Sequence, residues 1–475
     1  MQKLVIPQFV GRENELEQLT RTLGSSRPTI SVIYGRRRVG KSFLISKALE
    51  NRNALFFEGL ENLPKKQQID NFCLQLTKQT GQKIGKAPKS WGEVFLLLEV
   101  PLKKTGMCIV LDEFQWMANY RTEIIANLKM VWDQYLSKLP GVSLILSGSI
   151  ASFMLTKVVR SNALYGRTDR VIQLHPFQLS ETQLMLPNYG DDELIEAQML
   201  LGGIPKYLEL IKDYPSLYLA IDDLAFSENG YFVDEFNRIF VSHFGKNDDY
   251  KNIIDILATH SYGLFRKELA QKAGADTGGG LTRLLEDLES AGFISSIRPL
   301  DKGPNSKLIR YILSDAFINF YYALMKNSNR SKSTQHSAIK FTDIIQTSEF
   351  RSWRGRAFEM LCMSHAHKIS EILGFSGIDY SFGPYFKSPA KMVKGLQVDL
   401  AFDRADHVIT VCEMKSSRNT VGLEVLKEIE NRTELLKKIF PQKTIQNVLL
   451  HTGSISKEVE YSPYIYKKIR ADELI

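Results

Sequence analysis

The feature that most constrains the fold of this 475-residue chain is segment 35–42, Gly-Arg-Arg-Arg-Val-Gly-Lys-Ser. Residues 29–34 form a short apolar run that predicts a buried strand before it, and residues 43–49 predict a helix after it. Strand, glycine-rich loop and helix in this order are the context of a phosphate-binding loop. The glycines let backbone N–H groups surround a phosphate, and the helix N-terminus adds partial positive charge. We therefore expect an α/β fold with a parallel sheet.

Each residue of this loop is a candidate for cofactor binding. Lys41 would reach the β- and γ-phosphates of a nucleotide, and Ser42 would ligate Mg²⁺. Two interpretations stay open for the three arginine side chains: a solvated loop face, which we favour, and contact with phosphate. The full candidate set is Gly35, Arg36, Arg37, Arg38, Val39, Gly40, Lys41 and Ser42.

Two adjacent acids close a second apolar run, residues 107–111. Asp112 at the carboxyl end of this predicted strand would hold Mg²⁺, directly or through water. Glu113 fits the general base that orients the attacking water. The alternative interpretation is that the two acids simply begin a loop. The phosphate loop upstream makes us favour the functional interpretation.

A third apolar run, residues 142–146, ends in Ser147-Gly148-Ser149. A small polar residue there is a candidate for contact with the γ-phosphate or the water, and we select Ser147. The alternative is a polar strand end with no role. Residues 53–57 and 170–174 predict two more strands. Together they predict a parallel sheet with crossover helices and a ligand at the carboxyl ends of the strands.

Four short motifs in the first half carry a family resemblance: Phe-Val-Gly-Arg-Glu at 9–13, Leu-Asp-Glu-Phe-Gln at 111–115, Leu-Tyr-Gly-Arg at 164–167 and Gly-Gly-Ile-Pro-Lys-Tyr-Leu at 202–208. They resemble the archaeal-type ATPase family, a STAND-like branch of the AAA+ superfamily. The resemblance implies ATP as the cofactor, with Gly11 and Arg12 near the adenine, and a helical lid.

The same resemblance implies roles for two further residues. Arg167 matches the arginine of the family's Tyr-Gly-Arg motif and would act as a charge sensor or finger. A structural salt bridge is the interpretation that we favour. Pro205 either senses the nucleotide or simply begins a helix.

The middle of the chain predicts a winged helix. Helices are expected at 250–259, 265–272 and 281–291, followed by a hairpin of residues 293–299 and 307–313. The third helix offers Arg283 but also Glu286, Asp287 and Glu289, and this acidity opposes phosphate contact. We favour a protein-contact or switch role over DNA reading. Residues 326–340 are polar, contain no acid and predict a linker.

The last third holds a second candidate centre. Residues 396–403 and 408–415 predict two strands of a hairpin. Because side chains alternate along a strand, Glu413 and Lys415 should share one face, with Asp399 on the neighbouring strand. Carboxylate oxygens suit a hard divalent cation, and the lysine would activate water or stabilise charge on a phosphate.

This pattern resembles the PD-(D/E)XK nuclease superfamily, through Trp-x-Gly-x-Ala-Phe-Glu at 353–359, Gln-Val-Asp-Leu at 397–400 and Glu-Met-Lys at 413–415. The resemblance implies that Glu359, Asp399 and Glu413 ligate Mg²⁺ or Mn²⁺ and that Lys415 assists catalysis. Val398 stands where the superfamily has proline. The alternatives are a relic that binds without cutting and an ordinary salt-bridged hairpin.

Composition limits the partners and the compartment. The formal net charge of +8 permits a DNA partner without demanding one, because a solvated basic surface explains it equally well. The four cysteines form no CxxC pair, and three lie among apolar neighbours, which indicates a reducing compartment. Residues 139–156, the longest uncharged run, are too polar for a membrane helix. We expect a cytoplasmic protein with no secretory leader and no membrane partner.

These observations predict an α/β protein with five segments. They are a P-loop AAA+-like ATPase domain at 1–180, a helical lid at 181–245, a winged-helix domain at 246–325, a linker at 326–342 and a PD-(D/E)XK nuclease-like α/β domain at 343–475. We expect an ATPase whose nucleotide state controls a metal-dependent nuclease acting on DNA. The alternative is a STAND-like switch for assembly or partner binding, with a nuclease-like domain that only docks. A protein partner at the winged helix and a homo-oligomer are further expectations.

Overall fold

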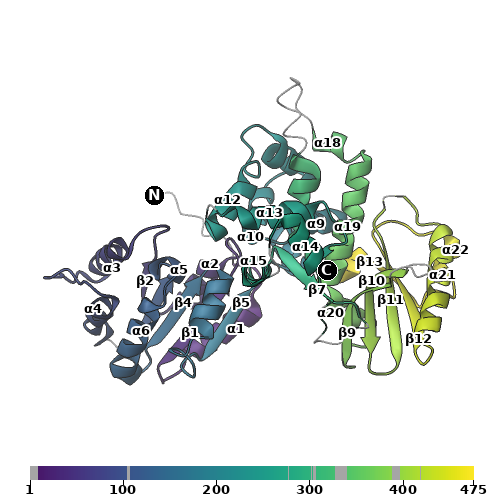
Figure 1. Ribbon diagram of the computed structural model, residues 1–475. Coiled ribbons are helices and arrows are strands. Elements are labelled where there is room, and N and C mark those ends of the chain that lie inside the picture. The colour runs from purple at the N-terminus through teal and green to yellow at the C-terminus, as the bar shows by residue number, and fades with distance from the viewer. Residues whose placement is uncertain are drawn as a thin grey trace. The chain divides into compact units, whose positions relative to one another are not determined.

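The chain folds into two compact units, Met1–Pro176 and Phe177–Ile475 (Figure 1). The computed structural model describes residues 9–103, 107–245, 247–275, 278–300, 302, 306, 308–326, 340–387, 396–417 and 419–475. The predicted linker falls largely on residues 327–339 and the predicted hairpin turn on residues 303–305, which lie outside the described residues. The five predicted segment boundaries stay predictions.

The first unit is built on a five-stranded parallel sheet with the order β2-β3-β4-β1-β5. The strands are β1 Thr29–Gly35, β2 Ala54–Glu58, β3 Cys108–Asp112, β4 Ser143–Gly148 and β5 Arg170–Leu174. Every residue of β1 is buried, as a central parallel strand requires. The five strands lie within two residues of the ranges that the apolar runs predict. The predicted parallel α/β sheet is confirmed.

Helices pack on this sheet. They are α1 Glu13–Leu23, α2 Lys41–Ala48, α3 Lys65–Thr80, α4 Trp91–Leu96, α5 Phe114–Met117, α6 Glu123–Gln134 and α7 Ala151–Phe153. Short 3₁₀ turns lie at η1 Leu97–Glu99, η2 Pro101–Lys103 and η3 Leu136–Lys138, and a π turn at η4 Met154–Val159. The largest buried rings, among them Trp91, Phe72 and Phe57, pack into one core with the sheet.

Strand β2 is an edge strand whose free side is covered by α3. Three glutamines on α3 each use both ends of the side-chain amide to bond the backbone N–H and carbonyl of one residue, at 2.5 to 3.0 Å; the pairs are Gln79 with Phe56, Gln75 with Glu58 and Gln68 with Leu60. These amides satisfy backbone groups that would otherwise offer a template for another strand.

The second unit begins with a group of helices: α8 Leu179–Met185, α9 Asp191–Leu201, α10 Pro205–Ile211, α11 Leu217–Ile221, the π turn η5 Asp222–Phe226 and α12 Glu235–Phe244. Pro205 is the first residue of α10, as the helix-start interpretation expects. Gly203 has φ 67°, and a Cβ there would lie 2.1 Å from the carbonyl oxygen of Phe177. Only glycine fits this turn before the proline.

The next segment combines three helices with a small antiparallel sheet of order β6-β8-β7. Its elements are α13 Asp248–Ala258, β6 Leu264–Phe265, α14 Arg266–Ala273, α15 Gly279–Ser290, β7 Ile294–Ile297 and β8 Arg310–Leu313. Two acids of α15 serve contacts inside the unit. Asp287 accepts from the Tyr250 hydroxyl at 2.7 Å, and Glu289 accepts from the backbone N–H of Ser296 at 2.8 Å.

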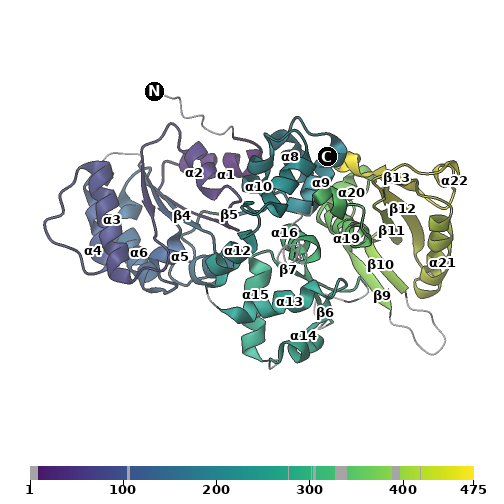
Figure 2. The ribbon, with the colours of Figure 1, turned by 90° about the horizontal axis from the view of Figure 1, so that it is seen from above.

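A third group of elements surrounds a mixed five-stranded sheet of order β13-β12-β11-β10-β9, in which β9, β10 and β11 are antiparallel neighbours and β11, β12 and β13 are parallel. Figures 1 and 2 show α19 and α21 on opposite faces of this sheet. The strands are β9 Tyr380–Lys387, β10 Leu396–Arg404, β11 Val408–Lys415, β12 Thr444–His451 and β13 Lys467–Arg470. The helices are α16 Ala316–Phe320, η6 Tyr321–Met325, α18 Phe341–Ile344, α19 Ser348–Ser364, α20 Ala366–Ile372, α21 Glu424–Ile439, α22 Lys457–Glu460 and η7 Ala471–Leu474.

A buried histidine ties α8 to the end of α19 within the second unit. His365 Nε2 accepts the backbone N–H of Leu179 at 3.3 Å, and Nδ1 lies 2.9 Å from the carbonyl oxygen of Leu361. Burial lowers the pKa of His365 from its usual value. The ring therefore serves this contact in its neutral form.

The four cysteines are free thiols, and the three that the sequence places among apolar neighbours are buried. Burial raises the pKa of Cys108 to about 12, so this thiol stays protonated.

Candidate nucleotide site and carboxylate cluster

The phosphate loop connects β1 to α2 and is closed around its lysine. Lys41 Nζ donates to the carbonyl oxygens of Gly35 at 3.0 Å and Arg36 at 3.1 Å. The side chain is 6% exposed, and burial lowers its pKa, partly offset by the nearby Glu113 and Asp112. A Cβ on Gly35 would lie 2.3 Å from the carbonyl oxygen of Leu174. Only glycine at position 35 therefore lets the end of β1 lie this close to β5. The loop thus holds one buried cation at its centre.

A hydroxyl and a carboxylate meet beside this lysine. Ser42 Oγ at the start of α2 donates to Asp112 Oδ2 at the end of β3 at 2.7 Å. Asp112 Oδ1 accepts the backbone N–H of Glu113 at 2.9 Å. The predicted Mg²⁺ ligands, Ser42 and Asp112, therefore lie together, and hard oxygen donors are the set that this ion prefers.

Glu113 has φ 47°, a left-handed conformation that is uncommon outside glycine. Its Oε2 accepts from Ser149 Oγ at 2.6 Å and from Gln115 Nε2, which also donates to Ser149 Oγ at 3.1 Å. This triad fixes the carboxylate that the sequence selects as the general base. Gln115 and Ser149 were not selected from the sequence. The signals that point to them are their places, two residues after Glu113 and directly after β4.

The hydroxyl that reaches Glu113 belongs to Ser149, whereas the sequence singles out Ser147. Ser147 lies within β4 opposite Ile33 of β1 and is fully buried. Among the described residues its hydroxyl has no hydrogen-bond partner. The sheet ends one residue after Ser147, so the hydroxyl that projects beyond the sheet is that of Ser149.

The three arginines of the loop have different surroundings. The guanidinium of Arg37 lies 5.5 Å from the ring centre of Trp116 and 3.9 Å from a carboxylate oxygen of Glu61. Arg38 has φ 75°. Arg36 is only 9% exposed, so the favoured interpretation of a solvated face is wrong for this residue. Its side chain is therefore packed against the protein and not turned to solvent.

Gly11 and Arg12, at φ 64° and 65°, turn the chain into α1. The Arg12 guanidinium donates to the carbonyl oxygen of Val39 in the phosphate loop at 3.4 Å and to that of His175 after β5. Arg12 is 6% exposed. The turn therefore lies against the phosphate loop. Its place near the adenine stays a prediction.

Arg167 forms a two-pronged ion pair with Asp133 of α6, at 2.7 and 2.9 Å. The hydrogen bonds from Arg167 lower the pKa of Asp133. This is the structural salt bridge that the sequence favours over a finger.

Glu413 and Lys415 share one face of β11, as strand alternation predicts, with Lys415 Nζ 2.9 Å from Glu413 Oε1. That face is turned to α21. Lys415 also pairs with Glu428 at 2.8 Å, and Arg432 pairs with Glu413 Oε2. Burial acts to lower the pKa of Lys415, but Glu428 and Glu413 hold the ammonium and raise it. Both oxygens of Glu413 are thus engaged by cations.

Asp399 lies on β10 directly before Leu400, which pairs with Cys412 of β11. The pairing of β10 with β9 shifts register next to it, between Val398 and Ala401, which interrupts the simple alternation. Gln397 Nε2 donates to Asp399 Oδ1 at 2.8 Å. Asp399 lines a pocket that Glu359 of α19 also lines.

Glu359, Asp399 and Glu413 are close enough to influence one another. Burial, followed by the charge of Asp399 and with a further contribution from Glu413, raises the pKa of Glu359 to about 7. Yet within the part of the chain that the structure describes, no three His, Cys, Asp or Glu side chains are arranged to hold a metal ion. The predicted cluster exists as neighbouring carboxylates without a formed metal site.

Comparison with known families identifies the first of these two sites. Residues 9–211 match the model of an ATPase domain found predominantly in Archaea.

This part of the chain is an archaeal-type ATPase domain.

Two proteins of Methanocaldococcus jannaschii are similar to this chain. The uncharacterized protein MJECL04 is 29% identical over 321 residues, which cover 66% of this chain and 68% of that protein. The uncharacterized ATP-binding protein MJ0423 is 49% identical over 47 residues, which cover 10% of this chain and 80% of that protein.

Three solved structures are partly similar. The Walker-type ATPase PABY2304 of Pyrococcus abyssi is 19% identical, with a TM-score of 0.49 and coverage of 66% of this chain and 96% of that one. The ORC2 protein of Aeropyrum pernix, in its ADPNP–ADP complexes, is 15% identical, with a TM-score of 0.45 and coverage of 70% and 98%. The STAND protein PH0952 of Pyrococcus horikoshii is 18% identical, with a TM-score of 0.29 and coverage of 78% and 50%. The assignment of the ATPase domain rests on the family match.

None of the helices that the structure describes is both long enough and apolar enough to span a bilayer.

Proposed function

We propose that this protein binds ATP at the phosphate loop and hydrolyses it. The observation that carries the proposal is the meeting of Ser42, Asp112 and Glu113 at one edge of the sheet, beside the buried ammonium of Lys41. These groups belong to the archaeal-type ATPase domain. They match the parts that phosphoryl transfer to water needs: a phosphate cradle, a metal ligand set and a base.

Each residue has a role in this mechanism. The ammonium of Lys41 leaves the carbonyl oxygens of Gly35 and Arg36 and contacts the terminal phosphates. Ser42 and Asp112 hold Mg²⁺, which neutralises charge on the phosphates when bound. Glu113 orients the attacking water and accepts its proton, and Ser149 keeps the carboxylate in place.

The direct test is phosphate release from ATP by the purified full chain in Mg²⁺, with EDTA as control. We expect turnover in Mg²⁺ and none in EDTA. Absence of both ATP binding and turnover would overturn the proposal.

We further propose that the nucleotide state controls a metal-dependent nuclease activity on DNA in the second unit. Support comes from the neighbouring carboxylates Glu359, Asp399 and Glu413 and from Lys415 beside them. Oxygen donors of this kind fit Mg²⁺ or Mn²⁺, which would polarise a scissile phosphodiester and its attacking water. Glu413 has to release Arg432 before it can ligate a metal. Release of that pair is a step at which the nucleotide state could act.

The test is cleavage of plasmid DNA with Mg²⁺ or Mn²⁺, with and without ATP. Lys415→Ala should reduce cleavage by orders of magnitude while ATP turnover survives, because Lys41 and Glu113 belong to the other unit. Lys427→Ala is the matched control, since this lysine is exposed on α21. Cleavage that persists in Lys415→Ala would place the activity elsewhere.

A second candidate function is a STAND-like switch in which ATP drives assembly or partner binding and the nuclease-like domain only docks. The ion pairs of Glu413 with Lys415 and Arg432 favour it, because they occupy both oxygens of a predicted ligand. The internal contacts of Asp287 and Glu289 on α15 also favour it over DNA reading. Light scattering with and without ATP tests it: a nucleotide-dependent change of mass without any cleavage would select this function.

A further inference from the structure

Within the second unit, part of the small antiparallel sheet is docked on the edge of the mixed sheet. We call the described residues 294–300 and 308–313, which include β7 and β8, the arm. Strand β9 is the edge strand that the arm meets. The backbone N–H of Leu300 donates to the carbonyl oxygen of Pro384 on β9 at 3.0 Å. The Leu300 side chain packs against the apolar cluster that contains Tyr385 of β9 and Leu436 of α21.

A cation fastens the arm to β9 at a second point. The Arg310 guanidinium on β8 lies over two rings, 4.6 Å from the ring centre of Phe265 and 4.2 Å from that of Phe386 on β9. A guanidinium is attracted to aromatic faces at such distances. Arg310 Nη1 also donates to the carbonyl oxygen of Tyr262 at 3.3 Å. The arm is therefore held by the backbone and side chain of Leu300 and by this stacked cation.

The residue of β9 that the arm contacts lies opposite Asp399. The pairing of β10 with β9 shifts register here, so that Asp399 and Leu400 of β10 together oppose Pro384 alone. Proline has no backbone N–H to donate to β10, and an extra residue on one strand redirects the side chains beside it. The arm thus holds the bulge that sets the direction of the Asp399 side chain.

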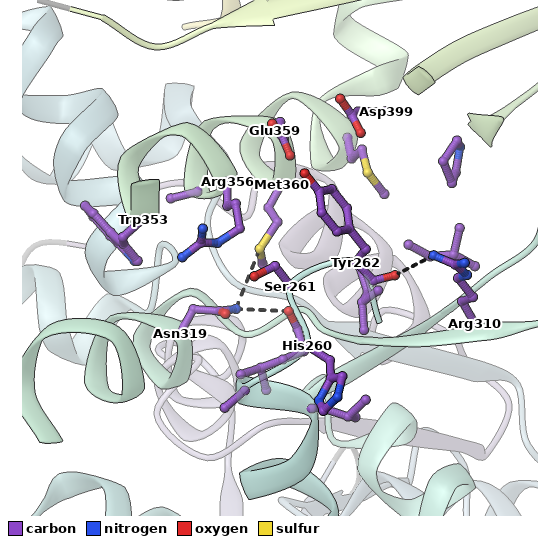
Figure 3. A pocket seen from close by; sticks show the side chains of 18 of the residues that line it. His260, Ser261, Tyr262, Arg310, Asn319, Trp353, Arg356, Glu359, Met360 and Asp399 are labelled. Carbon is purple, nitrogen blue, oxygen red and sulfur yellow. Dashed lines mark hydrogen bonds between the residues drawn. The ribbon is translucent and has the colours of Figure 1, made fainter. Parts of the chain in front are cut away.

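With the arm docked, the carboxylates face only a small cavity. Arg310 of the arm, Tyr262, Glu359 and Asp399 all line this cavity of about 120 Å³. Figure 3 shows the Tyr262 ring pointing toward the two carboxylates. Such a cavity holds a few water molecules and excludes a phosphodiester that is part of a duplex. The structure, in which the described residues form no group of three His, Cys, Asp or Glu side chains able to hold a metal, is therefore a closed form of the cluster.

We propose that the arm is an autoinhibitory element. Docked on β9, it closes the carboxylate cluster to a duplex and keeps Asp399 out of metal-binding geometry. When the arm leaves β9, the bulge relaxes and Glu359 and Asp399 become accessible to a divalent cation and a phosphodiester. The proposal rests on the proposed nuclease function and names its regulation: the population of the docked form sets the basal activity.

Amide hydrogen exchange of the full chain tests the docked contact itself. Arg310→Gln removes the stacked cation, and Phe386→Leu removes the ring that it contacts on β9. Each variant should speed exchange at the Leu300 N–H at least about tenfold. Arg298→Gln is the matched control, because it removes the same charge from an exposed position of the arm. A thermal melt of each variant shows whether it is folded. Unchanged exchange at Leu300 in both folded variants overturns the proposal.

Calorimetric titration with Mn²⁺, without DNA or nucleotide, tests whether the arm closes a metal site. Arg310→Gln and Phe386→Leu should each bind Mn²⁺ at least about tenfold more tightly than the wild type and Arg298→Gln, because release of the arm frees the carboxylates. Adding Glu359→Gln to Arg310→Gln should remove this gain, which assigns the ion to the carboxylate cluster and not to the phosphate loop. A gain that survives Glu359→Gln, or no gain in either variant, overturns the proposal.

Cleavage of plasmid DNA in Mn²⁺ without ATP separates this proposal from the nuclease function. Both variants should cleave at least about tenfold faster than the wild type. The double variant Arg310→Gln/Phe386→Leu should be no faster than the better single variant, because both changes break one contact. Wild-type cleavage as fast as that of both variants retains the nuclease function and rejects the autoinhibitory arm. Tighter Mn²⁺ binding without cleavage by any variant rejects the nuclease function and retains the arm as the element that closes a metal site.

Discussion

The phosphate-loop site and the carboxylate cluster are both made of acids and a lysine at the ends of strands, yet the partners that hold their side chains differ. In the first, Ser42 already contacts Asp112, and Glu113 is held by Ser149 and Gln115. In the second, Glu413 is held by Lys415 and Arg432, which are cations and not fellow ligands.

The difference shows how each site is assembled. The phosphate loop is one continuous backbone segment whose position follows from the strand before it and the helix after it. The cluster draws on α19, β10 and β11, and the neighbouring α21 supplies competing partners. The loop takes its place when the sheet forms, and the acids at the end of β3 meet it at the same edge of that sheet. The cluster instead depends on how side chains from separate helices and strands pair.

The largest expected effect is that of Lys41→Ala on ATP binding. The variant removes the buried ammonium at the centre of the loop, so affinity should fall at least about a hundredfold. Calorimetric titration with ATP measures it, and Lys47→Ala on the same helix is the control because that lysine pairs with Glu50 near the surface. Unchanged ATP affinity in Lys41→Ala would show that segment 35–42 is not the phosphate-binding site.

Glu113→Gln should slow hydrolysis about a hundredfold while ATP still binds, because an amide cannot accept the proton of the water. Single-turnover phosphate release together with ATP titration separates the two effects. A variant that hydrolyses ATP at the wild-type rate would show that Glu113 is not the base and that the contacts from Ser149 and Gln115 serve only the fold.

A pair of serine variants sharpens the comparison within the first site. Ser149→Ala should lower turnover about tenfold, because the Glu113 carboxylate loses one hydrogen bond that orients it. Ser147→Ala should change turnover less than about twofold, since its buried hydroxyl has no partner among the described residues. Steady-state ATPase rates of both variants measure these effects. A larger loss of turnover in Ser147→Ala than in Ser149→Ala would show that Ser147 is the functional residue.

The smallest effect concerns pH and the packing on which the second unit depends. Burial lowers the folded-state pKa of His365 below that of the unfolded chain, near 6.5. The unfolded state therefore binds the extra proton first, so the stability contribution is complete above about pH 6.5. It is lost as the pH falls toward the folded-state pKa, by at most about 1.4 kcal/mol per pH unit.

Urea unfolding between pH 7.5 and 5 measures this slope. His365→Gln should flatten it, and His367→Gln should leave it unchanged because that ring is 75% exposed. An identical slope in His365→Gln would show that the buried ring does not titrate with unfolding.

Several features were predictable because they are local. The strands of the first sheet, the phosphate loop between β1 and α2, and the acids at the end of β3 all follow from short runs of adjacent residues. The common face of Glu413 and Lys415 follows from strand alternation alone.

Other features required the packed chain. The choice of Ser149 over Ser147 depends on where β4 stops, two residues further than its apolar run indicates. The burial of Arg36 is a second such feature, because neighbouring residues in the sequence do not announce it. The shift in register between β10 and β9 beside Asp399 is announced by no pattern in β10.

The sequence by itself therefore determined the parallel α/β sheet, the phosphate loop and the residues able to serve it, since backbone conformation and apolar periodicity act over neighbouring residues. Only the tertiary structure decided which hydroxyl meets Glu113 and which cations occupy Glu413. Such pairings join side chains from elements far apart in the chain. Their outcome depends on helix docking and side-chain rotamers, which a linear pattern does not record.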